Sequence, residues 1–214
     1  MDAKELVGKL HWLGHDSFRL DGPPVIYLDP CELKVQLPKA DLVLVSHEHY
    51  DHCSPDHVKK VSGPKTVVVA AAEAAKKLRG ARAVRPGDRL TVAGVEIEAV
   101  PAYNLNKFRS PGVPFHPREA ENVGFIVTVG GVRLYFAGDT DQIPEMADVA
   151  CDVALLPVSG TYVMTAEEAA AAARTLKPKI VVPMHYGSGI GTADDGRHFA
   201  EFYGGEVVLL KAES

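Results

Sequence analysis

The stretch DLVLVSHEHYDHCSP, residues 41–55, runs from an apolar segment into a dense group of histidine and aspartate side chains. The continuous apolar run at 42–45 is typical of a strand that is buried on both faces. Ser54 followed by Pro55 indicates the start of a helix, because serine caps the first turn and proline fits its first position. The stretch therefore predicts a strand, a polar loop and a helix.

The polar loop places His47, His49, Asp51 and His52 within six positions. Such crowding belongs either to a metal site or to a polar turn. Alternate residues of an extended chain share a face, so we expect His47 and His49 to point the same way. Imidazole and carboxylate groups are ligands of zinc and also suit manganese and iron. Asp51 stands where the helical zinc motif H-E-x-x-H requires its second histidine, which excludes that motif.

Four further polar residues follow apolar segments elsewhere in the chain. Asp139 comes after VRLYFAG and His185 after KIVVPM, and each alone fits a turn as well as a site. Asp29, in YLDP, is either a turn residue before proline or a carboxylate that orients a metal-binding imidazole. His15, in the turn of WLGHDSF, either approaches the site or bonds to the backbone.

Short apolar segments alternate with helical patterns along the chain. Strands are expected at 11–15, 17–22, 25–30, 41–47, 66–70, 95–100, 124–129, 132–139, 152–158, 179–185 and 206–210, and helices at 56–61, 71–80, 165–178 and 193–205. Gly130-Gly131 predicts a tight hairpin. This order is typical of an α/β sandwich with outer helices. We see no linker or repeat, so residues 1–214 are expected to form one domain, with a long, structureless loop at 103–121.

The overall composition limits the partners. The net charge is −5, and a broad nucleic-acid surface usually needs a basic face. The sequence has no apolar run of bilayer length, and its three cysteines lack C-x-x-C spacing. We therefore expect a cytoplasmic protein without a membrane partner, and the charge makes a nucleic-acid partner less favoured than a small-molecule substrate. A homo-oligomer is compatible with this composition.

Taken together, these segments resemble the metallo-β-lactamase fold superfamily. SHEHYDH matches its H-x-H-x-D-H motif, GDTD its bridging aspartate and PMHYG its last metal-binding histidine. WLGHDSF and YLDP are similar to the opening strands of the branch that includes the ascorbate-6-phosphate lactonase-like enzymes. The resemblance covers nearly the whole chain and implies a four-layer αββα sandwich.

The resemblance also implies a set of metal ligands and a mechanism. His47 and His49 would bind a first metal, and Asp139 would bridge it to a second. The second metal would be bound by Asp51, His52 and His185. One or two divalent ions are implied, zinc or manganese before iron, and they would activate a water molecule. Asp51 would orient this water or accept its proton.

One position departs from the family pattern. Many members supply another histidine for the first metal, but the expected segment PAYNLN has Tyr103 and Asn104 there. His116, in FHPRE, is the only histidine between His57 and Asp139. His116 is either the missing ligand, a substrate contact together with Arg118, or a surface residue. If it is not a ligand, the first metal site is weak and the enzyme would work with one metal.

The leading hypothesis is a metal-dependent hydrolase of a small anionic ester, lactone or phosphoester. Three cations of the long loop, Lys107, Arg109 and Arg118, are candidates to meet the anion. Alternatives are a nuclease or phosphodiesterase of the same fold and a non-catalytic metal-binding or sensing protein. An iron oxygenase in the same scaffold is a lesser alternative.

Overall fold

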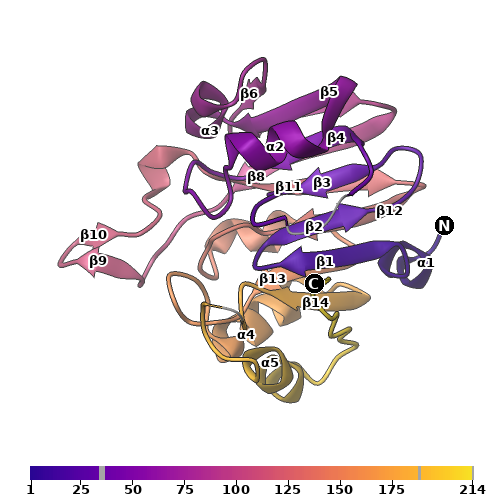
Figure 1. Ribbon diagram of the computed structural model, residues 1–214. Coiled ribbons are helices and arrows are strands. Elements are labelled where there is room, and N and C mark those ends of the chain that lie inside the picture. The colour runs from indigo at the N-terminus through magenta and orange to yellow at the C-terminus, as the bar shows by residue number, and fades with distance from the viewer. Residues whose placement is uncertain (34–36, 188, 214) are drawn as a thin grey trace.

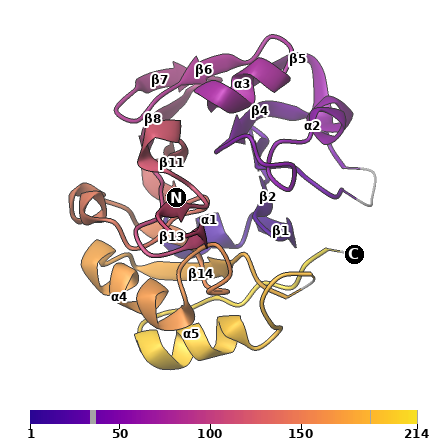
Figure 2. The ribbon, with the colours of Figure 1, turned by 90° about the vertical axis from the view of Figure 1, so that its left-hand side faces the viewer.

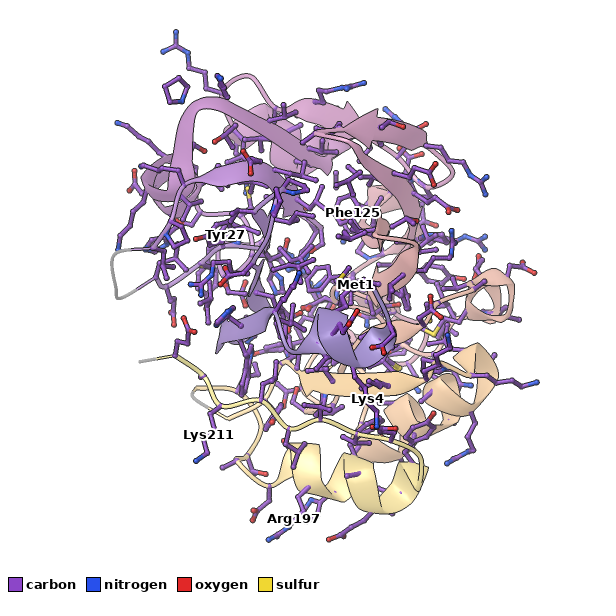
Figure 3. The ribbon with its side chains drawn as sticks, turned by 90° about the vertical axis from the view of Figure 1, so that its right-hand side faces the viewer. Met1, Lys4, Tyr27, Phe125, Arg197 and Lys211 are labelled. Atoms are coloured by element: carbon purple, nitrogen blue, oxygen red, sulfur yellow. The ribbon has the colours of Figure 1, made fainter. Side chains whose placement is uncertain are left out.

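Two six-stranded sheets make up the body of the protein. The computed structural model describes residues 1–33, 37–187 and 189–213. Figures 1 and 2 show the sheets stacked on each other with helices on the two outer faces. Phe125 is buried in the interior, whereas Lys4, Arg197 and Lys211 lie at the surface (Figure 3). The layers are therefore helix, sheet, sheet and helix.

The first sheet is built from the N-terminal part of the chain. Its strands follow chain order: β1 (Leu10–Gly14), β2 (Ser17–Leu20), β3 (Ile26–Leu28), β4 (Ala40–Val45), β5 (Ser62–Ala71) and β6 (Arg82–Val84). Helices α2 (Pro55–Val61) and α3 (Ala72–Lys77) cover its outer face. Within β4, Val43 and Val45 pack toward these helices, while Leu42 and Leu44 join the core between the sheets. The apolar run is thus buried on both faces, as predicted.

The second sheet has the order β14-β13-β12-β11-β8-β7. Its strands are β7 (Arg89–Val92), β8 (Val95–Pro101), β11 (Val123–Val129), β12 (Val132–Phe136), β13 (Val153–Pro157) and β14 (Ile180–Met184). Helices α4 (Ala166–Leu176) and α5 (Asp195–Tyr203) lie outside it, and α1 (Ala3–Val7) precedes β1. None of the helices in the described ranges is long and apolar enough to cross a bilayer.

Most predicted elements are confirmed, including the β11–β12 hairpin at Gly130-Gly131 and the capping box of α4. Two predictions are wrong. Residues 206–210 make only an isolated bridge, in which Val207 pairs with Val181. The segment 103–121 is not structureless, because it holds the hairpin of β9 (Phe108–Ser110) and β10 (Val113–Pro114) and a 3-10 turn at Arg118–Ala120.

Strand direction brings the polar residues to one end of the sandwich. β2 is antiparallel to β1 and β3, and β3 is parallel to β4, so β1, β3 and β4 point the same way. In the second sheet, β12, β13 and β14 are parallel. His15, Asp29, His47, Asp139 and His185 all lie just beyond the C-terminal ends of these strands.

Candidate metal centre

Three imidazoles and one carboxylate converge in the first half of the site. His49 Nδ1 lies 3.2 Å from His47 Nε2 and 3.1 Å from His116 Nε2. Asp139 Oδ2 lies 3.3 Å from His116 Nε2 and 4.0 Å from His47 Nε2. The long loop therefore brings His116 to the place where the sequence lacked a third histidine.

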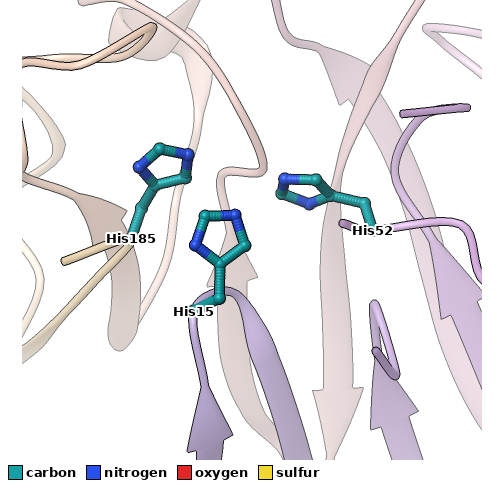
Figure 4. Close-up of side chains that lie close together, drawn as sticks. All are labelled: His15, His52 and His185. Atoms are coloured by element: carbon teal, nitrogen blue, oxygen red, sulfur yellow. The ribbon is translucent and has the colours of Figure 1, made fainter. Parts of the chain in front are cut away.

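The second half also gathers around Asp139. His52 Nε2 lies 3.4 Å from Asp139 Oδ1, and His185 Nε2 lies 3.4 Å from Asp139 Oδ2. Asp51 Oδ2 is 4.0 Å from His52 Nε2 and 3.3 Å from His15 Nε2. Figure 4 shows the rings of His15, His52 and His185 turned toward a common space. The six residues that the family resemblance implied as ligands thus lie together.

Hydrogen bonds to the outer nitrogens fix most of these rings. Asp29 Oδ2 lies 2.8 Å from His52 Nδ1, and Ser46 N donates to Asp29 Oδ1 at 2.7 Å. The Nδ1 atoms of His47, His116 and His185 lie 2.9 Å from Ser46 Oγ, Asn104 Oδ1 and Ser159 Oγ respectively. Such partners orient an imidazole and set which nitrogen is free to coordinate. In all four rings the nitrogen left to face the other donors is Nε2.

The charges of the cluster shift its pKa values strongly. Burial opposes ionisation of Asp139, but the charges of His185 and His52 outweigh it and hold the carboxyl pKa well below its usual value. Burial also disfavours a charged His52, yet Asp139 and Asp29 raise its pKa well above normal. Burial lowers the pKa of His116 to about 4, which keeps this imidazole neutral and able to coordinate.

A divalent cation fits these donors. His52 Nε2, His185 Nε2 and Asp139 Oδ1 are buried and have no hydrogen-bond partner among the described residues. Buried polar atoms without partners are rare in folded proteins, and each one needs an explanation. The donor atoms of His47, His49 and His116 lie within 4.8 Å of one another, as do those of His15, His52 and His185. Nitrogen and carboxylate donors in this arrangement suit zinc, manganese or iron.

A small pocket opens beside the first half of the site. Its volume is about 220 Å³, and its lining consists of His49, Tyr50, Asp51, Phe115, His116, Asp139 and Tyr162. Phe115 and Tyr162 form an edge-to-face pair with ring centroids 4.5 Å apart. The space next to the donors is therefore sized for a small molecule and has aromatic walls.

The three loop cations take different positions from one another. Lys107 is mostly buried and lies 2.7 Å from Glu168 and 3.4 Å from Asp141. Arg118 donates to Glu145 at 2.7 Å, and its side chain is 67% exposed. Arg109 lies over the ring of Phe115 at 5.7 Å from its centroid. Lys107 therefore forms ion pairs within the protein and is not available to a ligand. Arg109 is the loop cation that contacts the pocket wall.

Sequence reasoning missed three residues of the centre. It noted Asn104 only as a missing histidine, and it did not single out Ser159 as a partner of His185. Asp16, next to His15, is fully buried beside His52. Its place in the quoted turn WLGHDSF was the available signal, but turn aspartates are common, and only the fold shows what surrounds this one.

Comparisons with known proteins place this geometry in context. A family model described as the beta-lactamase superfamily domain matches residues 9–185. A UPF0173 metal-dependent hydrolase from Methanoculleus marisnigri is 37% identical over 185 residues, covering 83% of this chain and 80% of that protein. A protein of the same description from Thermococcus kodakarensis is 34% identical over 221 residues, covering 95% and 96%.

Solved structures agree on the fold. A metal-dependent hydrolase from Parabacteroides distasonis matches with a TM-score of 0.84 and 36% identity, covering 95% of this chain and 93% of that one. The metallo hydrolase Igni18 from Ignicoccus hospitalis matches with a TM-score of 0.76 at 24% identity, covering 96% and 95%, which is a likeness of fold alone. These matches confirm the predicted α/β sandwich of the metallo-β-lactamase type.

Proposed function

The chain belongs to the beta-lactamase superfamily and is a metal-dependent hydrolase, and we propose that it cleaves a small anionic ester, lactone or phosphoester. The observation that carries the proposal is the convergence of imidazole and carboxylate donors around Asp139, where His52 Nε2, His185 Nε2 and Asp139 Oδ1 are buried and have no hydrogen-bond partner among the described residues. We propose residues 1–214 as one catalytic domain and the cytoplasm as its compartment. The free thiols of Cys31, Cys53 and Cys151 support that compartment.

The proposed ligands fall into two sets. His47, His49 and His116 would hold one ion, Asp51, His52 and His185 would hold the other, and Asp139 would contribute to both sites. Mixed imidazole and carboxylate donors suit zinc, manganese and iron, and we propose zinc or manganese before iron because the family resemblance implies that order. When bound, a divalent ion would supply Lewis-acid chemistry that activates water for attack near neutral pH.

Asp51 has a second proposed role at the mouth of the site. It lines the pocket described above, and its side chain is 26% exposed. Burial would raise its pKa, but the His15 imidazole, whose Nε2 lies 3.3 Å from Oδ2, and the charge of His52 lower the pKa to about 2. A carboxylate that stays ionised in this way is a better hydrogen-bond acceptor than proton carrier. We therefore assign Asp51 to orienting the attacking water, with His15 holding the carboxylate in place.

The substrate class is proposed from the pocket and the loop cations. A volume of about 220 Å³ suits a small molecule. Arg109, which contacts Phe115 in the pocket wall, is the proposed partner of the anionic group. Arg118 is retained as an outer contact, because most of its side chain is exposed near His116 in the chain. Large polynucleotides are disfavoured by the net charge of −5.

The proposal is tested with the variants His52→Ala and Asp139→Ala. Each should lose bound metal and hydrolysis of a lactone, an aryl ester or bis-nitrophenyl phosphate while keeping a folded circular-dichroism spectrum. His198→Ala is the matched control, because this histidine is exposed on α5. Full hydrolysis by a metal-free double variant would refute the proposal. Turnover of RNA with none of the small esters would favour the nuclease alternative.

A further inference from the structure

Asp16 is a buried carboxylate that belongs to neither of the two ligand sets proposed above. It lies in the turn between β1 and β2, and its side chain is 0% exposed. Neither carboxylate oxygen has a hydrogen-bond partner among the described residues. Asp16 Oδ2 lies 3.9 Å from His52 Nδ1, and the donor atoms of Asp16, His52 and Asp139 lie within 4.8 Å of one another. Asp16 therefore belongs to the wall of the second half of the centre.

The turn holds Asp16 in this place from both sides. On one side, the carbonyl oxygen of His15 accepts hydrogen bonds from Trp12 Nε1 at 2.8 Å and from His185 N at 3.3 Å. On the other side, Ser17 Oγ donates to the carbonyl oxygen of Asp29 at 2.6 Å. These contacts fix the residues on both sides of Asp16, so its carboxylate stays against the cluster and away from solvent.

Burying such a group is costly unless a positive charge compensates it. An ionised carboxylate without hydrogen bonds in the interior costs several kcal/mol. The charged neighbours that influence Asp16 are histidines of the cluster and Asp139. Asp139 makes the cost larger, because a second carboxylate close by repels the first. A divalent cation between these groups would remove the repulsion and supply the missing partner.

The two halves of the centre also differ in chemistry. The first half offers three imidazoles, from His47, His49 and His116, and shares Asp139. The second half is richer in carboxylates, because Asp16 and Asp51 lie on its side. Carboxylate oxygens suit manganese and other hard cations, whereas imidazole nitrogens suit zinc.

We propose that Asp16 is a ligand of the second metal position and makes that position select a harder divalent cation than the first. The inference rests on the metal centre proposed above and extends it to a residue outside the ligand sets given there. Asp16 then raises the affinity of the second position for manganese(II) relative to zinc(II), compared with the imidazole-rich first position. No change in the proposed reaction is required.

The test compares the whole protein with Asp16→Asn, which keeps the side-chain shape and removes the charge. Metal-free protein is titrated with Mn²⁺ alone, followed by electron paramagnetic resonance, and with Zn²⁺ alone, followed by a competing chromophoric chelator. Asp16→Asn should weaken Mn²⁺ binding at one position by about tenfold or more and Zn²⁺ binding by less, given that even outer partners of metal ligands contribute 10–100-fold. Asp21→Asn, a partly exposed site at the end of the same hairpin, is the matched control and should bind both ions normally.

A separate measurement excludes a merely structural role. Without metal, Asp16→Asn should melt at the same or a higher temperature than the parent, because the buried carboxyl group that it replaces makes no hydrogen bond with the described residues. Unchanged Mn²⁺ affinity in the variant, or equal loss of both ions together with a lower metal-free melting temperature, would overturn the inference. The parent protein could instead show the inferred dependence of Mn²⁺ binding on Asp16 and yet hydrolyse none of the test substrates. That result would refute the proposed function and leave this inference standing.

Discussion

The contact between Asn104 and His116 gives the sharpest prediction about the first half of the centre. Asn104 Oδ1 accepts from the backbone nitrogen of His116 at 2.9 Å and lies 2.9 Å from its Nδ1. Asn104 Nδ2 donates to the carbonyl oxygen of Tyr162 at 2.9 Å. Asn104→Ala removes all three contacts and leaves His116 free to rotate. We predict weaker metal binding at the first position only.

The size of the effect follows from these contacts. Loss of a partner that orients a ligand lowers metal affinity by about 10–100-fold, which is about 1.4–2.7 kcal/mol. Three lost hydrogen bonds at about 1 kcal/mol each also reduce the free energy of unfolding by about 3 kcal/mol at most. The backbone bond from Asn104 N to His116 O, at 2.8 Å, remains and limits how far the loop can move.

The assay is a Zn²⁺ titration against a chromophoric chelator, which resolves the two positions by affinity. Asn106→Ala is the matched control, because its side chain lies in the same loop and donates to Glu168 rather than to His116. Asn104→Asp, which keeps the acceptor oxygen, should restore most of the affinity. Two unchanged zinc affinities in a folded Asn104→Ala protein would refute the assignment of His116 as a held ligand.

Three further predictions concern stability. Removing metal with a chelator should lower the melting temperature and readdition should restore it, since a ligand at a hundred times its Kd stabilises by about 2.7 kcal/mol; equal melting with and without chelator would contradict this. Hydrogen bonds from Arg133 and Lys179 hold the pKa of Asp152 below 3.8, so its contribution is complete above pH 3.8 and is lost as the pH falls through the folded-state pKa. Asp152→Asn should therefore lower the melting temperature at neutral pH, and the difference should shrink in acid; a constant difference would be evidence against the ion pair. Thr165→Ala removes the cap of α4 and should cost about 1 kcal/mol in urea unfolding, whereas no cost would mean that water replaces the cap.

Local chemistry explains which elements the sequence could predict. Strand β4 and helix α2 were found from an apolar run, Ser54 and Pro55, because each signal acts within a few residues. Strand β6 was missed because Arg82 and Ala83 are exposed and give it no apolar face. Residues 206–210 have strand-forming side chains, yet they pair with β14 through only two backbone hydrogen bonds around Val181.

In the candidate site, too, the sequence could predict the residues that lie close together in the chain but not those that meet only in the fold. The spacing of His47, His49, Asp51 and His52 was visible because all four lie in one loop. Asp139 and His185 gained meaning only from their order in the family pattern. Asn104, Ser159 and Asp16 could not be found from the sequence, since each acts through a contact across the fold.

The loop that carries His116 is anchored by contacts that have nothing to do with metal. Asp141 Oδ2 accepts from the backbone nitrogens of Leu105 at 2.6 Å and Asn106 at 2.9 Å. Lys107 lies 2.7 Å from Glu168, the residue that completes the capping box of α4. Lys107 therefore stabilises the loop rather than meeting an anion. The first metal position thus depends on a long segment tied to a distant helix, whereas the second is assembled mainly on strand ends. Loss of the Asp141 or Lys107 anchor should consequently weaken the first position before it affects the second.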